Sequence, residues 1–263
     1  MSITLNGTTG VTTSGLTSNG IDDNATSTAI TIDASENVGI GTAAPSFPLS
    51  VQSNSSAEGL LILGRSSDDI GEIAFRENDN STALGELQYR QDHAILRHRV
   101  GDLRFATGGT TERMRIDATG AVTMPHQPAF LVAPSGAQSN ITVGNEVTVV
   151  FGTEIFDQNA DFASNQFTAP VTGRYQLNLT LYINAIDSAS DYYHIKIWTS
   201  NRIYSSVIDP GVLASDPVYW NIPIAVLADM DLGDIAKVTI KQNNGTAQTD
   251  IINETTFSGH LVA

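Results

Sequence analysis

The chain has 263 residues, of which 41% are hydrophobic and 16% charged, with a formal net charge of −15 and no cysteine. The missing cysteine excludes disulfides, thiolate metal sites and cysteine nucleophiles, and the acidic balance argues against nucleic acid, which binds to basic patches. No apolar run approaches the roughly 20 residues of a membrane span, and the N-terminus lacks the basic and apolar regions of a secretory signal. We expect no membrane insertion.

Residues 1–35 are predicted to form an extended arm. Nineteen of the first thirty residues are Ser, Thr, Asn or Gly, a composition that buries too little apolar surface to fold alone. Apolar residues nevertheless recur among them, and we expect Ile3, Leu5, Val11 and Leu16 to dock onto a partner. A flexible tail is the alternative.

Residues 36–124 are predicted to form a thin β shaft. A weak internal repeat relates residues 30–40 to residues 114–124, and each copy reads as strand, polar turn and strand. Between the copies, alternating patterns predict strands at Leu60–Leu63, Glu72–Arg76, Gly85–Tyr89, Ala94–His98 and Asp102–Phe105. Each strand has one narrow apolar face, which favours an interwoven homotrimeric β shaft or β-prism. Cross-strand ion pairs are expected between Glu86 and Arg90 and between Asp102 and Arg104.

Three prolines, Pro125, Pro128 and Pro134, indicate a linker over residues 125–134. Residues 135–263 then read as an all-β sandwich or jelly roll. The clearest alternation predicts a strand from Tyr175 to Ile183. Further strands are predicted at Val147–Phe151, Tyr192–Trp198, Ile222–Leu227, Ala236–Lys241 and Thr256–Val262, with a hairpin-type turn at Asn244-Gly245. No segment predicts a convincing helix; the nearest is Ala225–Leu232.

Residues 129–263 carry a spaced pattern of aromatic and turn residues. It comprises Phe151, Asp157, Phe162, Phe167, Gly173 and Tyr175, then Leu232-Gly233-Asp234 and the closing Phe257-Ser258-Gly259-His260-Leu261. The pattern resembles the complement-type globular head, the trimeric jelly roll shared with tumour necrosis factor. Leu177 and Leu179 replace aromatics of that family, and the gap from Phe162 to Phe167 is two residues shorter. The resemblance implies a trimeric jelly-roll head.

Short phrases in the first half of the chain resemble bacteriophage fibre proteins. They are Ile3-Thr4-Leu5-Asn6-Gly7-Thr8-Thr9-Gly10, Asn37-Val38-Gly39-Ile40-Gly41-Thr42 with Pro45, and Thr111-Glu112-Arg113-Met114-Arg115-Ile116-Asp117. In such proteins the last phrase often precedes a self-cleaving chaperone domain, and here the predicted jelly roll takes its place. The resemblance implies a virion location.

Two groups of residues are candidates for ligand binding. Loop carboxylates are hard oxygen ligands that suit calcium, and the candidates are Asp187, Asp191, Asp229 and Asp231, although no calcium-loop motif is present. Solvated turn aspartates are the alternative. Aromatic side chains on a surface contact sugars or proteins, and the predicted receptor surface is Tyr192, Tyr193, Tyr204, Tyr219 and Trp220. Core or subunit-interface positions are the alternative for these. No other cofactor is expected.

The sequence therefore predicts a homotrimeric virion fibre of a bacteriophage that binds and does not catalyse. Its arm would attach to a tail or capsid protein, and its head would contact a host-surface glycan or protein. A capsid-attached head fibre or decoration protein, a trimerisation tip without a receptor, and a polysaccharide depolymerase are the alternatives. No G-x-S-x-G elbow or H-E-x-x-H motif supports an enzyme.

Overall fold

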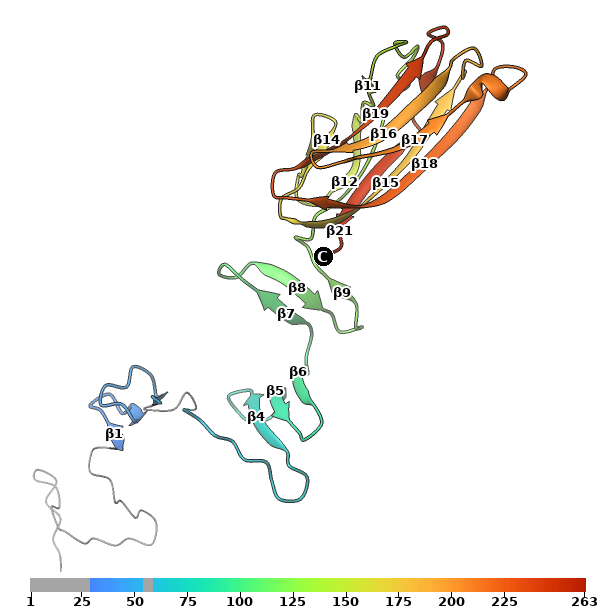
Figure 1. Cartoon of the computed structure of the whole chain (residues 1–263). Coiled ribbons are helices and arrows are strands. Elements are labelled where there is room, and N and C mark those ends of the chain that lie inside the picture. Colours follow the sequence, from blue (N-terminus) through green and yellow to red (C-terminus); the bar gives the residue numbers. More distant parts are fainter. Residues whose placement is uncertain (1–28, 54–58) are drawn as a thin grey trace, which may run out of the picture. The chain divides into compact units, whose positions relative to one another are not determined.

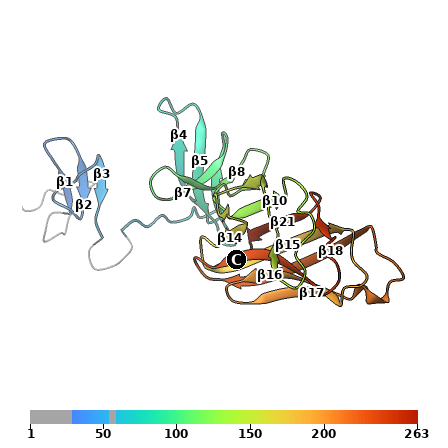
Figure 2. The same cartoon turned by 90° about the horizontal axis from the view of Figure 1, so that it is seen from above.

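The computed structural model describes residues 29–53 and 59–263, which form strands and one short 3-10 helix, η1 (Pro210–Val212) (Figures 1 and 2). The predicted all-β class is confirmed. Within the described residues, no helix has the length and apolar character that crossing a membrane requires. The predicted anchor residues Ile3, Leu5, Val11 and Leu16 lie outside the described part of the chain.

The described residues fall into two compact units, which meet at Arg99 and Val100 in the sequence. The first unit contains two three-stranded sheets, ordered β1-β2-β3 and β4-β5-β6. Their strands are β1 (Ile30–Ile32), β2 (Val38–Ile40), β3 (Leu49–Val51), β4 (Gly71–Arg76), β5 (Ala83–Tyr89) and β6 (Ala94–His98). Only β2 and β3 pair in parallel. The strand predicted at Leu60–Leu63 is wrong, because this segment forms no ladder with any strand of the described residues. Its Leu60 and Ile62 line the same hollow as residues of β4 and β5.

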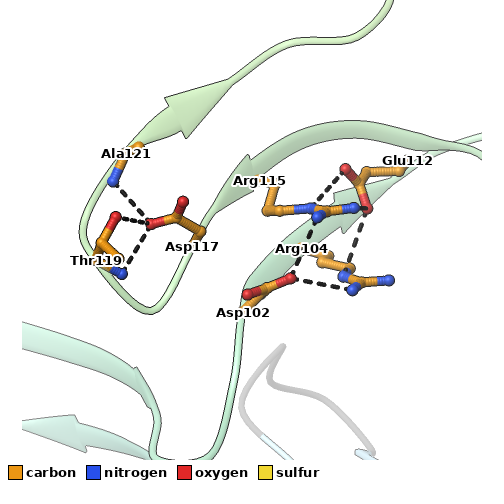
Figure 3. Close-up of polar contacts among 7 residues, drawn as sticks. All are labelled: Asp102, Arg104, Glu112, Arg115, Asp117, Thr119 and Ala121. Carbon is orange, nitrogen blue, oxygen red and sulfur yellow. Dashed lines mark hydrogen bonds and ion pairs between the residues drawn. The ribbon is translucent and has the colours of Figure 1, made fainter.

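The second unit begins with a third small sheet, ordered β7-β8-β9. Its strands are β7 (Leu103–Ala106), β8 (Glu112–Ile116) and β9 (Val122–Thr123). The predicted repeat is confirmed, since β8–β9 and β1–β2 are hairpins with the same turn. In the later copy the Asp117 Oδ1 atom accepts the backbone N–H groups of Thr119 at 2.8 Å and Ala121 at 3.0 Å (Figure 3).

The earlier copy of the turn repeats these bonds. The Asp33 Oδ1 atom accepts the backbone N–H groups of Ser35 at 2.8 Å and Asn37 at 2.9 Å. Both turns place their fourth residue in the left-handed region, with φ of 65° at Glu36 and 92° at Gly120. Glycine adopts this conformation without strain and glutamate does not. The same backbone is therefore less strained in the later copy.

The rest of the second unit is a sandwich of two sheets. Sheet I has the order β12-β10-β21-β15-β18, with β20 beside β15, and sheet II has the order β13-β14-β19-β16-β17, with β11 beside β19. The strands of sheet I are β10 (Ala129–Ala133), β12 (Thr153–Asp157), β15 (Gly173–Asn184), β18 (Tyr219–Met230), β20 (Asp250–Ile251) and β21 (Thr256–Leu261). Those of sheet II are β11 (Val147–Thr148), β13 (Phe162–Ala163), β14 (Gln166–Thr168), β16 (Tyr192–Thr199), β17 (Ile203–Ile208) and β19 (Ile235–Asn243). The chain crosses repeatedly between the two sheets, and the last strand of the sandwich, β21, pairs with its first, β10. This arrangement is a jelly roll.

One hydrophobic core lies between the two sheets. Alternate residues of the strands enter it, so Tyr175, Leu177 and Leu179 of β15 are fully buried while the residues between them are not. Phenylalanines from distant parts of the chain meet there: the ring of Phe130 lies 4.8 Å from that of Phe167 and 5.2 Å from that of Phe257, centre to centre. The predicted aromatic pattern is thus the core of the sandwich.

Two further details of the prediction, the linker and the hairpin-type turn, are wrong. The stretch 125–134 is not wholly a linker, because β10 lies within it and buries Phe130. Its flanking prolines stand outside the strand and so remove no hydrogen bond from it. The strand predicted at Ile222–Leu227 is confirmed as part of β18, which also includes most of Ala225–Leu232. The turn at Asn244-Gly245 forms with positive φ at both residues, but the chain then continues to β20 in the other sheet.

Candidate functional site: interaction surfaces

The three small sheets each have an apolar face and a polar face. In β1–β3 the cross-strand partners on one face are all aliphatic, and the other face carries Thr31, Gly39 and Ser50. The aliphatic set is Ile30, Ile32, Val38, Ile40, Leu49 and Val51. All but the half-buried Val38 are exposed in the single chain. A face of this composition in water is unfavourable unless something covers it.

The sheet β4–β6 has the same two-sided design. Its apolar face contains the cross-strand row Ile73, Leu87 and Leu96, and Phe75 and Tyr89 lie on the same side. A hollow of about 270 Å³ over this face is also lined by Leu60 and Ile62 of the preceding segment. The apolar side of the sheet is therefore open and continues onto a segment that has no strand partner.

The opposite face of β4–β6 carries a buried carboxylate that is bonded to two arginines. Glu86 is only 2% exposed, and its Oε1 atom accepts hydrogen bonds from Arg97 at 2.6 Å and Arg99 at 2.9 Å, while Oε2 accepts another from Arg99. Arg90, the partner predicted from sequence, donates to Gln88 instead. The expected pair of Glu86 and Arg90 is wrong because the strand register brings the arginines of β6 and its following turn across β5.

In β7–β9 the polar face is an alternating network of four side chains (Figure 3). Arg104 contacts Asp102 at 3.0 Å and Glu112 at 3.5 Å, and Arg115 contacts the same two carboxylates at 3.4 and 2.9 Å. The predicted pair of Asp102 and Arg104 is confirmed. The apolar face carries Leu103, Phe105, Met114, Ile116 and Val122.

Burial separates these sheets from the sandwich. Among residues 29–53 and 59–263, eighteen of the thirty exposed large hydrophobic residues lie between Ile30 and Met124, and the buried hydrophobic residues begin at Phe130. Within the described residues before Phe130, the buried side chains other than glycine and proline are Glu86 and Gln88. The small sheets therefore have no hydrophobic interior within one chain.

The predicted receptor aromatics do not form one surface. Tyr193 is fully buried in the core, and its hydroxyl accepts the backbone N–H of Asp187 at 3.0 Å, so its assignment to the surface is wrong. Tyr204 and Trp220 pack partly against the core, and Tyr192 is half-buried. Tyr219 is exposed, at 63%. The alternation of Tyr193 with the buried isoleucines of β16 is the reason for its burial.

The calcium candidates lie at two ends of strand β15. Asp187 and Asp191 follow its last residue, whereas Asp229 is paired in register with Arg174 near its first. In the described part of the chain, no group of three or more His, Cys, Asp or Glu side chains is arranged to hold a metal ion. The structure thus gives the calcium hypothesis no common site.

The candidate aspartates have local partners instead. Asp187 is buried and accepts backbone N–H groups of Ala189 and Thr246, which ties two loops together. The guanidinium of Arg202 donates to both carboxylate oxygens of Asp229, at 2.9 and 2.7 Å, and lowers the pKa of that carboxyl to about 2. Asp191 accepts from the side chain of Asn243, and Asp231 is exposed. Asp187, Asp191 and Asp229 thus have hydrogen-bond partners within the chain, and Asp231 faces solvent.

Sequence reasoning missed a basic surface on sheet II. All three lysines of the chain, Lys196 on β16 and Lys237 and Lys241 on β19, occupy its outward positions, and we call this surface the lysine face. In register, Lys237 stands opposite Trp198 and Lys241 opposite His194. The ammonium of Lys237 lies 5.0 Å from the centre of the Trp198 ring. The outward position of each lysine could have been predicted from the sequence, because each alternates with apolar residues in a predicted strand.

Glu146 is the one carboxylate that forms an ion pair on the lysine face. It pairs with Lys196, and its Oε2 atom accepts the hydroxyl of Thr239 at 2.7 Å. The Nε2 atom of His194 is buried there without a hydrogen-bond partner. Burial lowers the pKa of His194 below 6.5, the ammonium groups of Lys196 and Lys241 lower it further, and Glu146 acts in the opposite direction. We expect a neutral imidazole at pH 7.

No protein-family model matches the chain, and no curated protein matches it. Similar solved structures include the globular domain of zebrafish complement 1qA protein, with 19% identity and a TM-score of 0.37, over 52% of this chain and 98% of that one. Murine APRIL at pH 8.0 is similar with 12% identity and a TM-score of 0.39, over 52% of this chain and 99% of that one. The jelly-roll architecture stated above rests on the strand order.

Proposed function

We propose that this chain is a structural fibre protein of a bacteriophage virion, in which three copies join along their small sheets. The arm of residues 1–35 would attach to another structural protein of the particle, and the sandwich would contact the host surface. The observation that carries the proposal is the set of three small sheets with one open apolar face each. The mechanism is binding, and the expectation that the chain is not an enzyme belongs to the proposal.

The small sheets support self-association because copies of one chain supply matching apolar faces. Each fully buried valine, leucine, isoleucine or phenylalanine contributes roughly 1.5–3 kcal/mol relative to an exposed one. Among the described residues from Ile30 to Met124, sixteen side chains of these four types are exposed. Three copies around a common axis would turn the apolar faces of the small sheets inward and their polar faces toward water. Closed symmetry makes this possible, because every copy presents the same face to the axis.

Sheet I of the sandwich offers a second surface for the same association. The outward residues at its centre are uncharged: Gln176, Asn178 and Thr180 on β15, Ser258 on β21, and Ala225 and Leu227 on β18. A chain with a net charge of −15 needs such a surface if its copies are to approach closely. The polar groups there also suit a wet interface.

The fibre phrases of the sequence support the virion role and the order of the parts. They fall in the first 117 residues, ahead of the sandwich, as expected if the attachment end comes first and the binding end last. Three sandwiches on one rigid shaft would bind a surface with avidity through effective concentration.

Sedimentation of the full chain tests the assembly. We expect a mass of three copies, and a stable monomer or dimer would contradict the proposal. The variants Ile73→Ser and Phe75→Ser should reduce the mass, because they place a hydroxyl on the apolar face of β4. Ala74→Ser is the matched control, since it introduces the same side chain on the opposite face of the same strand.

Adsorption tests the role of the sandwich. The full-length trimer, added at saturating dose, should block the attachment of the phage that carries this protein to its host. A trimer that leaves adsorption unchanged would limit the sandwich to a trimerisation tip. Antibody labelling of whole particles would show whether the protein stands on the tail or on the capsid.

A further inference from the structure

The lysine face is a concentration of positive charge in an acidic molecule. Residues 125–263 contain thirteen acidic and five basic residues, and three of the five are Lys196, Lys237 and Lys241. Their neighbours along the strands, such as Ile195 and Val238, are fully buried, so the three ammonium groups share the outward side of sheet II. Like charges gathered on one face repel one another, which is a cost to the isolated fold.

The face also positions its charges. Lys237 is placed by its contact with the ring of Trp198, which favours a cation over the aromatic surface. Lys196 is placed by Glu146, which Thr239 holds in turn. Among residues 29–53 and 59–263, no carboxylate forms an ion pair with Lys237 or Lys241. Two of the three ammonium groups are therefore free to bind an external anion.

The spacing of the lysines favours a polyanion whose negative charges are far apart over one whose charges are closely spaced. Lys237 and Lys241 are four residues apart on one strand, about 13 Å at roughly 3.3 Å per residue. Thr239, between them on the strand, is buried and donates its hydroxyl to Glu146. The exposed Ser205 stands two strands across, on the other side of Lys196. DNA carries one negative charge per about 1.7 Å of its axis, and a protein with a net charge of −15 repels so dense a polyanion.

We propose that the lysine face binds a carboxylated polysaccharide. Separate carboxylates of the polymer would pair with Lys237 and Lys241, and sugar hydroxyls would exchange hydrogen bonds with the exposed Ser205. The outward side of the adjacent strands β17, β16 and β19 offers a surface three strands wide to an extended chain of sugar rings. This inference deepens the proposed function, because it names the chemistry of the host surface that the sandwich would contact, and it rests on that function.

Binding of purified polymers to the full chain tests the inference. Hyaluronate, which has one carboxylate for every two sugars, is the probe; dextran is the neutral control and single-stranded oligo-dT the dense polyanion. At low salt we expect hyaluronate to bind, dextran not to bind, and oligo-dT to bind more weakly than hyaluronate. Lys237→Gln and Lys241→Gln should each weaken hyaluronate binding about tenfold when three copies act together.

Two further variants make the test specific. Arg174→Gln causes the same change in net charge on sheet I and should leave hyaluronate binding unchanged. Glu146→Gln should strengthen binding, because it releases Lys196 from its internal partner. Equal binding of dextran, tighter binding of oligo-dT, or lysine variants that bind as the parent does would each overturn the inference.

Sedimentation of the same samples separates this inference from the fibre proposal. A trimer that does not bind hyaluronate would refute the carboxylate-binding site but would not contradict the fibre proposal. A monomer that binds hyaluronate through the lysine face would refute the fibre proposal and support the carboxylate-binding site.

Discussion

The three small sheets of residues 29–124 and the sandwich of residues 129–263 are made of similar alternating strands, yet they bury them in different ways. In the sandwich, the apolar sides of two sheets of one chain face each other, and twenty-five buried hydrophobic residues form a single core. In the small sheets, the apolar side faces outward and the buried side chains are Glu86 and Gln88. Alternation in a sequence therefore indicates a two-sided strand, but not whether the same chain supplies the second layer.

The largest effect should come from truncating the core of the sandwich. Leu179→Ala removes a side chain that is 1% exposed and leaves a cavity, so the free energy of unfolding should fall by about 2–5 kcal/mol. Tryptophan fluorescence in denaturant reports this transition selectively, because both tryptophans of the chain, Trp198 and Trp220, lie in the sandwich. Leu232→Ala makes the same change at an exposed loop residue and should shift stability by less than about 0.5 kcal/mol. Equal losses in the two variants would contradict the assignment of the core.

The next effect should appear in the small sheets alone. Glu86→Gln removes the charge from a buried acceptor of three hydrogen bonds, and we expect β4–β6 to lose about 1.5–3 kcal/mol. Hydrogen exchange of the amides of β4–β6 should quicken, while the tryptophan transition of the sandwich stays in place. Glu77→Gln, at an exposed site just beyond β4, is the control. A shift of the tryptophan transition would show that the two regions are coupled.

A smaller effect separates the two copies of the repeat. Gly120→Ala places a β-carbon at a φ of 92° and should destabilise the β8–β9 hairpin by about 1–2 kcal/mol. Glu36→Gly relieves the same strain in the β1–β2 hairpin and should stabilise it by up to about 1 kcal/mol. Hydrogen exchange at the two turns measures both changes. Effects of equal sign would refute the equivalence of the turns.

The smallest effect is a dependence of sandwich stability on pH. The pKa of His194 is lower in the folded chain than its ordinary 6.5, so folding favours the neutral imidazole. Stability from this group is therefore present above pH 6.5 and is lost as the pH falls through the folded pKa. Lys196 on its own strand, Lys241 on β19 and Glu146 are the charged groups that act on it. In His194→Gln, the loss of tryptophan-detected stability between pH 7 and pH 5 should be smaller; an unchanged loss would contradict this role.

The sequence was most informative where alternation was long. The strands β15, β16, β18, β19 and β21 were predicted because apolar residues enter the core at every second position. The aromatic pattern indicated the jelly roll, and the structure buries its Phe151, Phe162 and Phe167 in the core. The strand β10 was missed because its flanking prolines read as a linker. The apolar faces of the small sheets were also predicted, since they depend on composition within each strand.

Features that depend on strand register were not predictable in the same way. Arg97 and Arg99 reach Glu86 only because β6 pairs with β5 in one alignment. The lysine face likewise arises when β16 pairs with β19, which brings together residues about forty positions apart. Tyr193 is a different case, because its alternation with Ile195 and Ile197 indicated the core before any register was known.

The order of the two regions has a consequence during protein synthesis. Because residues 29–124 bury no large hydrophobic side chain within one chain, a nascent polypeptide presents these faces before the sandwich has been translated. Translation of the 139 residues from 125 to 263 takes roughly 7–28 s at about 5–20 residues per second. For that interval the ribosome-bound segment is open to proteases, chaperones and premature pairing, and the C-terminal sandwich is the first part able to fold without help.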